Sequence, residues 1–67
     1  MSHKPPPEFT EGDIVVVAGF DDVPEHLFRI ETVEDDLVTG IALTGPLAGS
    51  YGEPAIEMIL RRVPDDQ

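Results

Sequence analysis

The chain has 67 residues, no cysteine and a formal net charge of −10, from fourteen acidic and four basic residues. This length allows a single domain, and the absence of cysteine excludes disulfides and thiolate metal sites as sources of stability. The acidity argues against direct binding to nucleic acid or to an anionic membrane, because both attract lysine and arginine, and it favours a basic protein partner. Solubility is the simpler explanation of the same charge.

The two ends of the chain differ from its middle. Residues 1–8, MSHKPPPE, are expected to form a flexible proline-rich tail, because consecutive prolines favour an extended polyproline conformation. Residues 64–67 are expected to form a second flexible tail. The domain is therefore predicted over residues 9–63, which hold eleven acids and three arginines. With no signal peptide and no apolar run of membrane-spanning length, the expected location is cytoplasmic.

The first strand is predicted over residues 13–18. Ile14, Val15, Val16 and Val17 are all β-branched, and such side chains suit a pleated surface. Because the apolar run is continuous, both faces of this strand are expected to be at least partly covered. A loop should follow, since the pair Asp21–Asp22 is typical of a turn and proline at 24 cannot donate to a sheet.

The middle of the chain predicts a hairpin. Residues 27–33 form the second strand, because Phe28 and Ile30 alternate with Arg29 and Glu31. A turn is predicted at residues 34–36 and a third strand at 37–43, in which Gly40 marks a sharp bend or a close approach of neighbouring backbone.

The last third of the chain begins with a long loop, residues 43–54, which is rich in glycine and proline. Residues 54–63 are expected to carry either a fourth strand alone or a fourth and a fifth strand split near Met58. A helix over residues 55–62 is the alternative, because apolar residues there recur at spacings of three and four. A single helical turn is compatible with the strand prediction.

This arrangement resembles the SH3-like small β-barrels. Gly12 and Asp13 before the run Ile14–Val17 carry the resemblance, and it is supported by Gly40 within a strand and by the ending Arg62-Val63-Pro64. It covers residues 9–63 and implies an all-β fold, a small SH3-like barrel of four to five short antiparallel strands that closes on itself. The chain lacks the basic character of the nucleic-acid-binding KOW modules in this group, so RNA binding is not expected.

Five residues are predicted to contact a partner. Phe20, Leu47 and Tyr51 offer apolar and amphipathic side chains on loops, and Asp21 and Asp22 offer negative charge beside them. A proline-rich or extended peptide fits such a surface, and the chain's own prolines leave a homo-oligomer open. The alternative is that these apolar side chains only close the ends of the barrel.

The preferred function is a non-catalytic protein-interaction module or accessory subunit that binds a basic, proline-rich or extended partner. We expect no catalytic residues, metal site or cofactor, because nucleophiles are scarce and so small a barrel rarely encloses an enzyme-sized pocket. One alternative is a nucleic-acid mimic that occupies a basic cleft. Another is a weak metal or small-ligand site at His26, a predicted surface residue, with Glu25 or Asp22.

Overall fold

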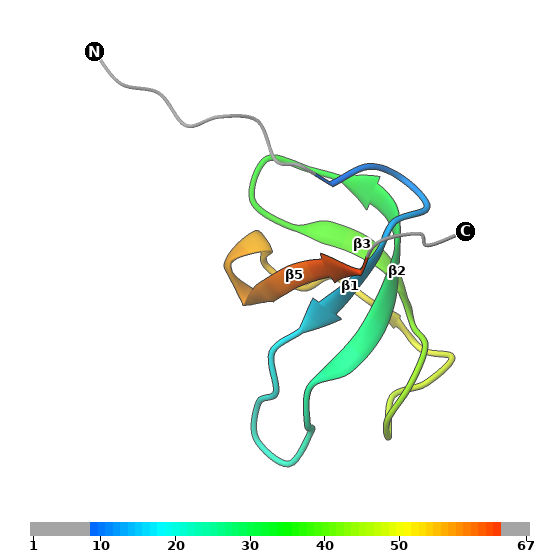
Figure 1. Cartoon of the computed structure of the whole chain (residues 1–67), viewed down its shortest axis with the longest axis vertical. Coiled ribbons are helices and arrows are strands. Elements are labelled where there is room, and N and C mark those ends of the chain that lie inside the picture. The colour runs from blue at the N-terminus through cyan, green and yellow to red at the C-terminus, as the bar shows by residue number, and fades with distance from the viewer. Residues whose placement is uncertain (1–8, 64–67) are drawn as a thin grey trace.

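A computed structural model describes residues 9–63, and the two predicted tails lie outside this range. The domain is all-β, as predicted, with every strand pair antiparallel (Figure 1). The elements are β1 (Ile14–Val17), β2 (His26–Val33), β3 (Val38–Ala42), β4 (Tyr51–Gly52), the 3₁₀ turn η1 (Ile56–Met58) and β5 (Ile59–Val63). Over residues 9–63, no helix is long and apolar enough to cross a membrane.

The strands form one sheet in the order β4-β3-β2-β1-β5. Strands β1 to β4 make a meander, and β5 returns to pair with β1, so β4 and β5 are the two edges. In a flat sheet these edges would lie about 19 Å apart, at about 4.8 Å per strand. Only residues 53–58 connect them, and half of that segment is coiled into η1, so the sheet is strongly curled (Figure 1).

The curled sheet does not close into a barrel, and this part of the fold prediction is wrong. In the part of the chain that the structure describes, no ladder joins β4 to β5. Two features of the sequence keep the seam open. Strand β4 has only two paired residues, and Pro54 just beyond it has no N–H group with which to extend the pairing.

The core lies on the concave face of the sheet. Alternate residues of β1, β2 and β3 point to this face, because successive side chains of a strand point to opposite sides. Val15, Val17, Phe28, Ile30, Val38 and Ala42 form the buried cluster. Val16 points the other way, yet its exposed fraction is only 6%. Both faces of β1 are therefore covered, as the continuous apolar run predicts.

Gly40 is a point of close backbone approach, as predicted. It pairs with Ile30 of β2 on one side and with Gly52 of β4 on the other. A Cβ atom at this position would collide with the carbonyl oxygen of Arg29 and would lie 2.8 Å from Cε2 of Phe28. The ring of Phe28 can pack across β3 only because no side chain is present there.

The predictions for the last third of the chain need two corrections. The fourth strand is β4, inside the segment predicted to be only a loop, and not at residues 54–58. It forms because the chain folds back on β3: the amide of Gly49 donates to Ala42, whose amide donates to Ser50. Residues 56–58 form the single helical turn that the strand prediction allowed, and β5 follows as a strand.

Candidate functional site

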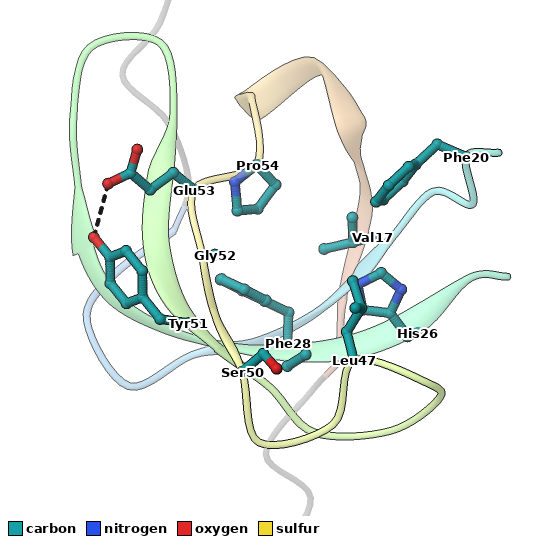
Figure 2. Close-up of a pocket in the computed structure, with 11 residues that line it drawn as sticks. Val17, Phe20, His26, Phe28, Leu47, Ser50, Tyr51, Gly52, Glu53 and Pro54 are labelled. Carbon is teal, nitrogen blue, oxygen red and sulfur yellow. Dashed lines mark hydrogen bonds between the residues drawn. The ribbon is translucent and has the colours of Figure 1, made fainter. Parts of the chain in front are cut away.

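A pocket of about 280 Å³ opens on the concave side of the sheet, between β4 and the two loops at that end (Figure 2). Its lining comes from β1, β2, β3, β4 and both loops, so no single segment of sequence defines it. The lining residues are Val17, Phe20, His26, Phe28, Ala42, Leu47, Ser50, Tyr51, Gly52, Glu53 and Pro54.

The floor of the pocket belongs to the hydrophobic core. Phe28 of β2 lies between the two sides of the pocket, with Val17 of β1 beside it (Figure 2). The side chains of Phe28, Val17 and Ala42 are all nearly inaccessible to water from the outside. Such a floor is rigid, because close-packed core side chains have little freedom to move.

The walls contain three exposed apolar side chains that the sequence predicted as partner contacts. Phe20, Leu47 and Tyr51 have exposed fractions of 43%, 37% and 58%. Figure 2 shows Phe20 and Tyr51 on opposite sides of the pocket, with Phe28 between them. The structure thus brings together residues up to 31 positions apart in the sequence. Much of each of these side chains is therefore accessible to a partner.

The position of Leu47 is set by two consecutive turns between β3 and β4. The amide of Ala48 donates to Gly45 at 3.1 Å, and the amide of Ser50 donates to Leu47 at 2.9 Å. Gly45 and Gly49 have φ angles of +83° and +88°, a region that suits glycine best. The glycines of this loop therefore serve a tight double turn, which places Leu47 at the wall of the pocket.

The position of Phe20 is set by a tight turn between β1 and β2. Phe20 and Val23 exchange two backbone hydrogen bonds of 2.8 and 2.7 Å. Asp21, inside the turn, has a φ of +49°, which aspartate tolerates better than most residues. Asp21 and Asp22 are exposed and do not line the pocket, so they flank Phe20 as a negatively charged turn.

Tyr51 is held by a neighbouring carboxylate. Its hydroxyl donates a hydrogen bond of 2.9 Å to Oε2 of Glu53 (Figure 2). This bond is the largest cause that raises the pKa of Tyr51 above its usual 10.0. A phenol that donates to a carboxylate gives up its proton less readily, because ionisation would place two negative charges side by side. Tyr51 is therefore neutral over the physiological pH range.

His26 is the main feature that sequence reasoning missed. It was expected at the surface, but its exposed fraction is 6% and it lines the pocket. Its Nδ1 atom lies 2.9 Å from the carbonyl oxygen of Pro24, which can only accept, so Nδ1 carries the hydrogen. The signal was present in the sequence: His26 is two residues before Phe28 and four before Ile30, so all three share the inner face of β2.

Over residues 9–63, no three histidine, aspartate or glutamate side chains come close enough together to hold a metal ion. At His26, Nδ1 is already engaged by Pro24, so any ligand would have to use Nε2. The arrangement instead offers an apolar surface with a few polar groups at its edge.

Together the fold and the pocket define a small all-β domain with a partly open apolar site. No protein-family model, no curated protein and no solved structure matches this chain.

Proposed function

We propose that the protein is a non-catalytic interaction module that binds an extended segment of a protein partner in this pocket. The observation that carries the proposal is the convergence of Phe20, Leu47 and Tyr51. They are three of the four exposed large apolar side chains over residues 9–63, and the fourth, Leu60, lies elsewhere on β5. Apolar side chains gathered at one site gain free energy when a partner covers them, at about 25 cal/mol per Å² of apolar surface.

The size and lining of the site suit a short extended segment. A volume of about 280 Å³ is near the lower end of the range of about 300–1,000 Å³ that is usual for ligand sites. It suits one or two side chains of a peptide whose backbone continues past the rim. Aromatic walls such as Phe20 and Tyr51 are the surfaces on which proline-rich segments dock.

The charges around the site favour a basic partner. Glu53 lines the pocket and the pair Asp21–Asp22 flanks Phe20, whereas none of the three arginines within residues 9–63 contributes to the lining. A lysine or arginine beside the docked segment would be attracted to this edge. Complementary charge of this kind contributes to specificity and to the rate of association.

The polar groups of the pocket support binding and not catalysis. The Tyr51 hydroxyl and the Glu53 carboxylate are paired with each other, and Nδ1 of His26 is paired with a backbone carbonyl. Ser50 and His26 both line the pocket, but within the described part of the chain no hydrogen bond joins their side chains. A serine nucleophile needs a base within hydrogen-bonding reach.

We also propose that the curled sheet is related to the SH3-like small barrels. The order of the strands supports this relation, because a meander whose last strand returns beside the first brings the two edges of a small sheet toward each other. Small barrels of this architecture host many unrelated functions, so the proposed function depends on the pocket and not on the fold.

The test is peptide binding by single-residue variants. Short synthetic peptides that combine prolines with arginine or lysine are titrated into the full chain, with acidic versions of the same peptides for comparison. Phe20→Ala, Leu47→Ala and Tyr51→Ala should each weaken binding by about 1–2 kcal/mol, or roughly 5- to 30-fold. Leu60→Ala removes an equally exposed apolar side chain outside the pocket and should change nothing. Equal losses from Leu60→Ala, or no binding of any basic peptide, would refute the proposal.

The contribution of charge has its own matched control. Asp21→Asn with Asp22→Asn should weaken binding of the basic peptides and reduce its dependence on salt. Asp35→Asn with Asp36→Asn removes the same charge from another exposed turn, the one between β2 and β3, and should have a smaller effect. If the two double variants behave alike, the attraction is a property of the net charge and not of this site.

A further inference from the structure

We propose that residues 4–7 of one copy, Lys-Pro-Pro-Pro, dock in the pocket of a second copy, so that the protein regulates access to its own binding site. This inference rests on the proposed function of the pocket. It adds the identity of one occupant, a segment of this chain that lies outside the described residues.

The chemistry of this segment matches what the pocket selects. Lys4 is the only lysine of the chain and directly precedes Pro5, Pro6 and Pro7. Proline rings are apolar, and a run of prolines is already extended, so little conformational entropy is lost when it binds. The segment therefore presents apolar rings for the walls formed by Phe20 and Tyr51.

The charges of the two surfaces are also complementary. Lys4 offers a cation next to the rings, and Glu53 and the turn at Asp21–Asp22 offer carboxylates at the pocket. The rest of the molecule opposes association, because residues 9–63 carry eleven acids against three arginines and two copies repel each other. The contact is therefore weak, which suits an occupant that an external partner must displace.

The position at which the segment joins the domain favours a second copy over the same copy. Phe9 is packed against its own core, and the amide of Gly12 donates to Ile30 at 2.7 Å. Pro7 is two residues before Phe9 and can lie at most about 7 Å from it. In Figure 1, residues 9–13 (blue) lie at the end of the molecule opposite the cyan and yellow loops that bound the pocket. Because residues 4–7 join the domain at that end, the occupant that we propose is the segment of a second copy.

The experiment uses two complementary full-length variants. Tyr51 is the only tyrosine and the chain has no tryptophan, so all emission in the tyrosine region comes from the pocket. The first variant replaces Lys4, Pro5, Pro6 and Pro7 by alanine and keeps its tyrosine. The second, Tyr51→Ala, keeps residues 4–7 but has no tyrosine emission. The first is called the emitting variant and the second the silent variant. When the silent variant is titrated into the first, the emission of Tyr51 should change and reach saturation.

The control titrant carries both sets of changes and should bind about tenfold more weakly or not at all. Identical curves for the silent variant and this control would overturn the inference. Leu47→Ala in the emitting variant should weaken the response, whereas Leu60→Ala should not, and circular dichroism checks that each variant is folded. If a second copy docked through another surface, the change in Tyr51 emission would depend neither on residues 4–7 nor on Leu47. That outcome would also overturn the inference.

The basic peptides separate this inference from the proposed function. If they bind the emitting variant while the silent variant does not, the pocket serves external partners and only the self-docking is wrong. If neither binds, both proposals fail. Where half of the pockets are self-occupied, replacing residues 4–7 should raise the apparent affinity for an external peptide about twofold. No gain at any protein concentration would contradict the regulation.

Discussion

Replacing Gly40 by alanine should destabilise the fold severely, whereas the same replacement at Gly52 should not. The two glycines are directly paired across β3 and β4 and both lie against the ring of Phe28. A Cβ at Gly40 would collide with the carbonyl oxygen of Arg29 and would lie 2.8 Å from the ring. A Cβ at Gly52 would lie 3.5 Å from the ring, which is an ordinary van der Waals contact.

The loss of stability in Gly40→Ala depends on how far the neighbouring strands can shift to make room for the added methyl group. Overpacking a core commonly costs about 1–3 kcal/mol, and the upper part of this range applies because β3 is held between β2 and β4 and cannot shift freely. A domain of this size has a total stability of only about 3–10 kcal/mol. At Gly52, alanine restricts the unfolded chain and should be neutral or stabilising by up to about 1 kcal/mol.

Urea denaturation followed by circular dichroism measures both changes. With a slope of about 1 kcal/mol per molar urea for a small domain, Gly40→Ala should lower the midpoint by roughly 2–3 M or leave the chain unfolded without urea. Gly52→Ala should keep the midpoint within about 1 M of the unchanged protein. If Gly40→Ala shifted the midpoint no more than Gly52→Ala, the close packing of β2 against β3 would be refuted.

Two further predictions concern the site and the core. Ultraviolet titration of the single tyrosine should give a pKa above 10.0, and Glu53→Gln should lower it, since the hydrogen bond to Glu53 is the main cause of the shift. Because folding raises this pKa, the bond stabilises the fold below pH 10.0 and its contribution is lost as the pH rises through the folded value; equal pKa values in both proteins would refute the bond. In the core, Ile30→Val should cost about 0.5–1.5 kcal/mol in urea denaturation, whereas Leu60→Ala at the exposed edge should stay within about 0.5 kcal/mol. The reverse order would contradict the assigned burial.

Much of the sheet follows from local sequence patterns. The β-branched run at residues 14–17 and the alternation around Phe28 predict β1 and β2, because strand side chains alternate between the two faces. The turn after Val33 follows from three consecutive acidic residues. At Gly40 the sequence left a sharp bend and a close backbone approach as alternatives, and the structure shows the close approach. The candidate contacts Phe20, Leu47 and Tyr51 also stand out in the sequence, because they are large side chains set among glycine, proline and acidic residues.

Other features depend on residues that are distant in sequence. Strand β4 exists because Gly49 and Ser50 bond to Ala42, and no propensity of the pair Tyr51–Gly52 reveals it. His26 lies two residues before Phe28, so the alternation of strand side chains predicts that both point into the core. Its neighbours Pro24 and Glu25 indicated a surface loop instead.

The sequence by itself determined that this chain is a small acidic β domain, because strand periodicity, turn residues and charge are local properties. Only the tertiary structure decided that the sheet stays open and that Phe20, Leu47 and Tyr51 share one pocket over Phe28. The physical reason is that closure and convergence depend on how far the sheet curls. The curl is set jointly by the pairing of β1 with β5, the shortness of β4 and the turn at Ile56–Met58, and not by any one segment.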